Sequence, residues 1–127
     1  MGVFLMKKVL LFFFTLFIIV GCSSDKEQVI NKLKPNIKDK YNVVIFAEDI
    51  PSRDFQDSVG NIDELWEGQE GKINSLTYKM LYKGEEREID YQAIFEIETY
   101  PKIVVLSNEG IVLQTNKLDE LQTFLEK

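Results

Sequence analysis

The sequence has no histidine and a single cysteine, Cys22, among its 127 residues. Without histidine, the chain has no imidazole base for a Ser-His-Asp triad and no histidine ligand for a Cys/His zinc site. A lone cysteine also excludes an internal disulfide. Positive charge is scarce, since 15 Lys and Arg residues stand against 21 Asp and Glu residues, which gives a net charge of −6. Nucleic-acid affinity comes largely from neutralising phosphates, so this balance predicts no nucleic-acid partner.

The N-terminal segment carries Lys7 and Lys8 but no acidic residue before Cys22. The two lysines are followed by an apolar run over residues 9–20, which only Thr15 interrupts. A basic start, an apolar run of this length and a small residue at its end are typical of a secretory signal peptide. Such a run spans about 18 Å as a helix, short of a hydrocarbon core of roughly 30 Å. We therefore expect residues 1–21 to be a signal peptide rather than a permanent membrane span.

The apolar run ends in Ile19-Val20-Gly21-Cys22. This segment resembles the lipobox of bacterial lipoproteins, in which an aliphatic residue and then a small residue precede the cysteine. The resemblance implies that Cys22 receives a diacylglyceryl group on its sulfur, becomes the new N-terminus and anchors the protein to the extracytoplasmic face of the cell membrane. The alternatives are an inert buried cysteine and a free thiol behind an ordinary signal peptide. Lysine makes up 13 of the 15 basic residues, a bias of AT-rich genomes that fits a single-membrane bacterium.

The chain after Gly21 has room for one compact core and no second domain. We interpret residues 22–28 as a lipidated tether and residues 29–127 as that domain. A capping-box pattern, Ser24-Asp25-Lys26-Glu27, precedes apolar residues at helical spacing and predicts a helix near residues 25–40. Pro35 should interrupt this helix, because proline lacks a backbone N–H.

The segment after this helix predicts a buried strand followed by helical turns. The run YNVVIFA at residues 41–47 is continuous and β-branched, which is typical of a strand buried on both faces. Ser52 is expected to cap a helix that Gly60 ends, with a further helical turn over residues 61–66. A glycine-flanked break follows at residues 68–71.

The second half of the chain predicts strands and a final helix. Apolar residues alternate with polar residues over residues 76–82, which favours a strand. Residues 85–98 fit either a second strand or a helix around residues 88–95, and the helix is favoured. The last third predicts a hairpin and a helix, with strands at 103–106 and 111–113 and a helix cap at Asn116.

Two segments of the sequence resemble thioredoxin. Val44-Ile45-Phe46-Ala47-Glu48 is similar to the family's central strand and the Ala-Glu that leads into its active-site loop. Residues 95–106 are similar to the segment that carries the family's cis-proline and the next strand, and residues 107–127 to its closing hairpin and helix. The resemblance covers roughly residues 41–59 and 93–127. It implies an α/β fold with a central mixed sheet, helices on both faces and a C-terminal β-hairpin followed by a helix.

The same resemblance predicts a cis peptide bond between Tyr100 and Pro101. The alternative is that Pro101 is only the first residue of a strand, where its missing N–H costs no ladder hydrogen bond.

The sequence departs from thioredoxin where the chemistry resides. Ile50-Pro51-Ser52-Arg53 occupies the position of the family's Cys-x-x-Cys, and Val44 occupies that of its buried acid. If the Cys22 sulfur is a thioether, no thiolate remains for disulfide exchange. We therefore expect no enzymatic activity, no cofactor and no metal. Paired carboxylates in a glycosidase-like or Ca²⁺-binding role are the alternative, but the acidic residues interleave with lysine, which favours a solvated surface.

The resemblance implies a groove between residues 48–53 and residues 100–102. In this family the groove receives an extended segment by backbone pairing. The partner is then an envelope protein or peptide; a redox-linked accessory protein that serves a partner's thiols or cofactor is the alternative function. Arg53 could hold a partner carboxylate, although capping or a surface salt bridge with Glu48 or Asp57 is favoured. The candidate binding residues are Glu48, Asp49, Ile50, Arg53, Tyr100, Pro101 and Lys102.

Overall fold

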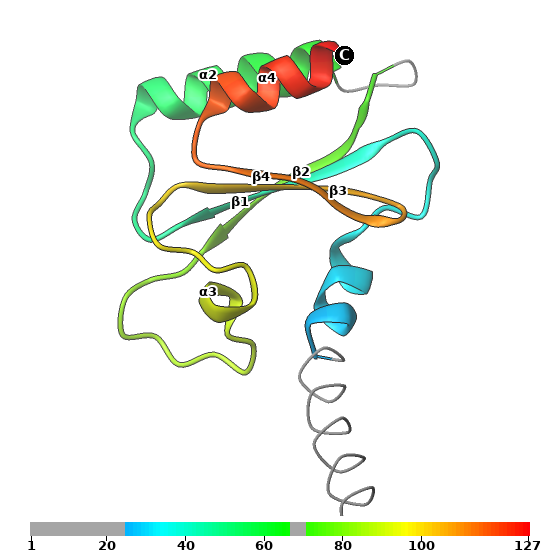
Figure 1. Ribbon diagram of the computed structural model, residues 1–127. Helices are drawn as coiled ribbons and strands as arrows, with labels where there is room; N and C mark the ends of the chain where they lie inside the picture. Colours follow the sequence, from blue (N-terminus) through cyan, green and yellow to red (C-terminus); the bar gives the residue numbers. More distant parts are fainter. Residues whose placement is uncertain (1–24, 67–70) are drawn as a thin grey trace, which may run out of the picture. The chain divides into compact units, whose positions relative to one another are not determined.

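The computed structural model describes residues 25–66 and 71–127, and the expected signal peptide and Cys22 lie outside these residues (Figure 1). The chain forms two units, Met1–Lys32 and Leu33–Lys127. The described part of the first is helical, and this helix continues to residue 33. The expected interruption at Pro35 is confirmed, but the prediction that the helix reaches residue 40 is wrong, because residues 34–40 are not helical.

The second unit contains a four-stranded mixed sheet with the strand order β2-β1-β3-β4. β2 is parallel to β1, whereas β3 is antiparallel to both β1 and β4. The predicted α/β fold with a mixed sheet is confirmed, and the first strand has the predicted bounds. The strands are β1 (Tyr41–Ala47), β2 (Ile73–Met80), β3 (Lys102–Ser107) and β4 (Gly110–Thr115).

The helix α2 (Arg53–Trp66) connects the parallel strands β1 and β2. Its predicted cap is confirmed, since the Phe55 N–H donates to Ser52 Oγ at 3.2 Å. The prediction that Gly60 ends the helix is wrong, because α2 runs through it. Glycine costs a helix about 1 kcal/mol relative to alanine, and the burial of Val59 and Ile62 on either side of it outweighs that cost.

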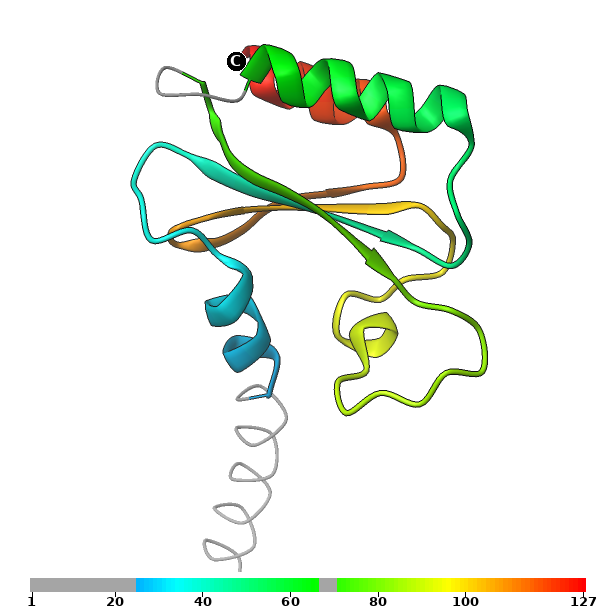
Figure 2. The same cartoon turned by 180° about the vertical axis from the view of Figure 1, so that it is seen from behind.

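Two long helices cover one face of the sheet. Figures 1 and 2 show α2 lying beside α4 (Leu118–Glu126) over the strands. Alternate strand residues and one stripe of each helix form the main core between them. Its members are Val43, Ile45, Val59, Ile62, Ile73, Ile103, Val105, Leu121 and Leu125. This face is called the helix face below.

The opposite face is covered by loops and the short helix α3 (Tyr91–Ile94), which lies below the sheet in Figure 1. It is called the loop face below. The Phe46 ring lies 5.5 Å from the Tyr91 ring and 5.2 Å from the Phe95 ring, measured between centroids. Helices therefore occupy both faces, as predicted. The favoured helix around residues 88–95 is confirmed but shorter, and the Asp90 carboxylate accepts a hydrogen bond from Ala93 N–H.

The predicted hairpin and C-terminal helix are confirmed, but the predicted cap of that helix is wrong. The N-cap residue of α4 is Lys117, which makes no side-chain capping bond. The Asn116 amide instead donates to the carbonyl oxygens of Thr99 and Pro101, at 3.0 and 2.8 Å. Asn116 therefore holds the segment before β3 in place. The Tyr100–Pro101 peptide bond is cis, as predicted.

Candidate functional site

The candidate site forms where β1 ends and β3 begins. These strands are antiparallel, and Phe46 near the end of β1 pairs with Lys102 at the start of β3. The loop after β1 therefore lies beside Tyr100 and Pro101, although some 50 residues separate them in the sequence. Loops at the carboxyl ends of parallel strands are frequent ligand sites in α/β sheets, and β1 and β2 both end on this side.

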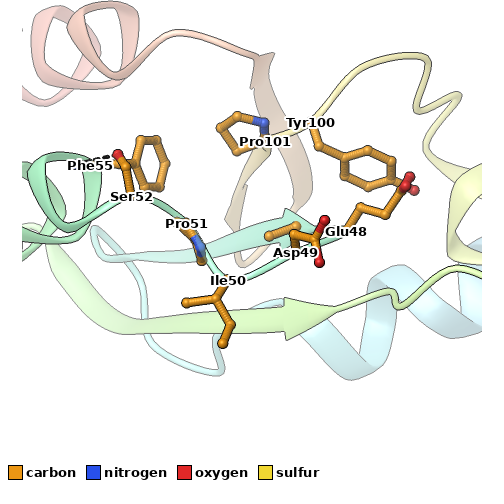
Figure 3. A pocket seen from close by; sticks show the side chains of 9 residues that line it. Glu48, Asp49, Ile50, Pro51, Ser52, Phe55, Tyr100 and Pro101 are labelled. Atoms are coloured by element: carbon orange, nitrogen blue, oxygen red, sulfur yellow. Dashed lines mark hydrogen bonds between the residues drawn. The ribbon is translucent and has the colours of Figure 1, made fainter.

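The loop and the Tyr100–Pro101 segment enclose a cavity of about 420 Å³, called the proline groove below (Figure 3). Its wall is mainly apolar, while the carboxylates of Glu48 and Asp49 lie on the side of Tyr100 in Figure 3. The lining residues are Ala47, Glu48, Asp49, Ile50, Pro51, Ser52, Phe55, Tyr100 and Pro101.

Five of the seven candidate binding residues line this groove, and Arg53 and Lys102 do not. Arg53 is the exposed first residue of α2. Within residues 25–66 and 71–127 it forms no ion pair with Glu48 or Asp57, so the expected surface salt bridge is not observed. Lys102 is half-buried at the start of β3.

Phe55 lines the groove but was not among the candidates. The sequence pattern predicted only that it lies in the helix capped by Ser52. Its position three residues after the capping Ser52 puts it in the first turn of α2, next to the loop. The predicted start of the helix was therefore the signal that Phe55 lines the groove, because side chains in a first helical turn border the preceding loop.

Ile50 is the most exposed large apolar residue in the described chain, at 76%. A single exposed aliphatic residue is ordinary on a protein surface. Ile50 differs because it adjoins Pro51 and Phe55 in the wall of the groove. A segment that entered the groove would bury its side chain together with theirs.

The main-chain groups of Tyr100 are available for pairing. Neither its N–H nor its C=O has a hydrogen-bond partner in the described part of the chain, whereas the carbonyls of Thr99 and Pro101 on either side accept from Asn116. An unpaired donor and acceptor at the edge of a groove is what an extended peptide needs for backbone pairing.

The Tyr100 hydroxyl keeps its proton at neutral pH. Burial raises its pKa above the ordinary 10.0, the Glu48 and Asp90 carboxylates raise it further, and the Arg87 guanidinium opposes them. Two carboxylates from different loops therefore act on one phenol. In its protonated form, Tyr100 can both donate and accept a hydrogen bond at the groove.

Chemically, this arrangement is suited to holding a peptide. Ser52 Oγ already accepts the Phe55 N–H, and the sequence supplies no histidine to activate it. Comparison of the chain with family models and with curated proteins finds no match. Among the described residues, no helix is both long and apolar enough to cross a membrane.

Proposed function

We propose that this protein is a lipoprotein anchored through Cys22 to the extracytoplasmic face of the cell membrane. Its thioredoxin-like domain would bind an extended segment of an envelope protein or peptide without catalysing a reaction. The observation that carries the proposal is the apolar-walled groove formed by residues 47–52 and Tyr100–Pro101. By the sequence resemblance, this groove corresponds to the place where thioredoxins engage their substrates, and Ile50 and Arg53 correspond to the family's cysteines.

The topology supports the thioredoxin-like part of the proposal. A parallel β1-α2-β2 unit is followed by an antiparallel β3-β4 hairpin and α4, in the strand order β2-β1-β3-β4. The sequence resemblance implies a central mixed sheet that is closed by such a hairpin and helix. Fold alone does not define function, so the binding role rests on the groove.

Binding can be tested by photo-crosslinking in native membranes. A benzophenone amino acid at Ile50 should crosslink a discrete envelope protein. The matched control carries the same group at Val112, which is also exposed but lies on β4. The proposal fails if both positions give the same products or if position 50 gives none.

Anchoring can be tested by metabolic labelling with a palmitate analogue. The natural chain should be labelled, and a Cys22→Ala variant should remain an unlabelled precursor. Labelling of both chains would contradict the lipobox interpretation. The natural chain should also stay in the membrane fraction at high salt, because an acidic domain gains nothing from anionic headgroups and the acyl chains hold it.

The absence of catalysis can be tested by a turbidimetric insulin-reduction assay. A lipidated Cys22 leaves the mature chain without a thiol, so no reduction is expected. Activity that disappeared in a Cys22→Ser variant would overturn the claim that the sulfur is blocked, and would favour a redox-linked role.

A further inference from the structure

A second hollow of about 490 Å³, called the loop hollow below, lies on the other side of Glu48 and Tyr100 from the proline groove. Most of the segment 81–92 lines it, together with Glu48 and Tyr100. These two residues also line the proline groove, so one wall separates the two cavities. An extended chain spans the distance across one side chain in about two residues. A peptide in the groove would therefore place a neighbouring side chain in the hollow.

The loop hollow differs from the groove in its chemistry. Polar and aromatic side chains line it, including Tyr82, which is 45% exposed. Lys79 already lies over the Tyr91 ring, 4.9 Å from its centroid. Tyr82 and Tyr100 thus remain as rings on which a planar cation could stack.

Negative charge is in excess around the two cavities. Arg87 pairs with Glu85 at 3.2 Å and donates to the Tyr82 carbonyl at 3.0 Å, so Arg87 and Glu85 together contribute no net charge. The remaining lining carboxylates belong to Glu48, Asp49 and Asp90, and the remaining lining cation is Lys83.

The two carboxylates of the loop hollow come from different elements. Glu48 follows β1, and Asp90 precedes α3, where one of its oxygens caps that helix. Glu48 forms no ion pair within the described chain. A cation entering the hollow would meet both carboxylates without first displacing a lysine or arginine from either.

We infer that the partner segment presents an arginine or lysine side chain to the loop hollow, between Glu48 and Asp90, next to an apolar side chain in the proline groove. This inference rests on the proposed peptide binding and specifies which side chains the bound peptide carries. Arginine fits best, because its planar guanidinium contacts carboxylates through several N–H groups and stacks on aromatic rings.

The test is to select a displayed library of random octapeptides on the full chain in mild detergent. Enriched peptides should carry arginine or lysine within two residues of an aliphatic residue. Replacing the arginine of a selected peptide by glutamine should weaken its Kd about five- to tenfold, as expected for two partly exposed ion pairs. In the double variant Glu48→Gln/Asp90→Asn this difference should vanish. Asparagine retains a side-chain oxygen for the α3 cap, and an unchanged circular dichroism spectrum confirms the fold.

The matched control is the double variant Glu86→Gln/Glu88→Gln. It makes the same change in net charge on the same loop, at exposed residues that line neither cavity. It should keep the preference for arginine. Enrichment without a basic residue, or an equal loss of preference in both double variants, overturns this inference and leaves peptide binding standing. If the library gives no enrichment at all, the proposed function fails and the inference fails with it.

Discussion

The two faces of the sheet use the same strands in different ways. On the helix face, Val43, Ile45 and their neighbours pack against α2 and α4. On the loop face, Phe46 is equally buried but packs against Tyr91 and Phe95, in and just after a helix of only four residues. Long helices close one face, and a short helix with the chain around it covers Phe46 on the other.

Because of this difference, we expect the helix face to determine stability and the loops of the other face to determine binding. Regular helices present their apolar residues at a fixed spacing and leave few hollows. The loops after β1 and β2 are held at their ends by the strands, but their side chains are free to shape cavities. Both cavities lie among these loops and the segment before β3. Changes on the helix face should therefore affect unfolding, and changes in the loops should affect binding.

The largest effect on stability is expected from Leu121→Ala. Leu121 is fully buried in the helix-face core, and removing three carbon atoms from such a site costs about 2–5 kcal/mol. Urea unfolding of the full chain in mild detergent, followed by circular dichroism, would measure the loss. The exposed neighbour substitution Gln122→Ala should change the free energy of unfolding by less than about 0.5 kcal/mol. Below the unfolding transition, Leu121→Ala should leave peptide affinity unchanged, and a parallel loss of affinity would break the proposed separation of the faces.

A smaller effect is expected where the two regions meet, at Ser52. Its hydroxyl caps α2, and its side chain also lines the proline groove. Ser52→Ala removes the cap and should lower the free energy of unfolding by about 1 kcal/mol. Ser58→Ala, an exposed serine within the same helix, should instead have a neutral or slightly stabilising effect. If both substitutions change the urea midpoint equally, the cap does not stabilise α2.

Replacing Gly60 by alanine should raise the free energy of unfolding, whereas Ser52→Ala should lower it. A Cβ atom there would meet nothing within 4 Å, so Gly60→Ala should stabilise α2 by about 0.5–1 kcal/mol. Gly84 in the loop also has open space, but its φ is +83°, which alanine adopts only with strain. Gly84→Ala should therefore destabilise the chain. The sign of the shift in the urea midpoint decides each case. Destabilisation by Gly60→Ala would contradict the helical assignment at Gly60, and stabilisation by Gly84→Ala would contradict the strained turn at Gly84.

The sequence predicted the elements whose signals are local. The β-branched run from Tyr41 to Ala47 defines β1, and the short polar connection after Ser107 defines the hairpin, whose loop is only residues 108–109. The pattern around Gly60 predicts a helix end, whereas α2 continues because Val59 and Ile62 pack in the core against the sheet, which no local pattern reveals. Asn116 was misassigned because its amide reaches carbonyls 15 and 17 residues earlier in the chain, which no local pattern reveals.

Part of the candidate site could also be predicted from the sequence. Resemblance to a known family located the loop after β1 and the Tyr100–Pro101 segment, and both line one groove. The loop hollow had no signal in the sequence, because it depends on how segment 81–92 folds back beside Glu48 and Tyr100. Contacts of this kind are set by tertiary structure.

The smallest expected effect concerns the pKa values of two tyrosines, Tyr78 beside the helix-face core and Tyr100 between the two cavities. Tyr78 packs against the helix-face core, and burial raises its pKa above the ordinary 10.0. The pKa of Tyr100 is raised by burial and then by Glu48 and Asp90. Both folded phenols thus keep their protons to a higher pH than in the unfolded chain. The stability they contribute is present below pH 10 and is lost as the pH rises through the folded pKa values.

Absorbance at 295 nm during an alkaline titration would separate the two tyrosines. Tyr78→Phe and Tyr100→Phe should each remove one late-titrating phenol. Glu48→Gln should lower the pKa of Tyr100 only in part, since burial is the larger cause, and should not affect Tyr78. Glu86→Gln, an exposed change outside both cavities, should alter neither. If Glu48→Gln leaves the Tyr100 curve in place, the Glu48 carboxylate does not act on that phenol, and the wall between the proline groove and the loop hollow carries less negative charge than recognition of a basic side chain requires.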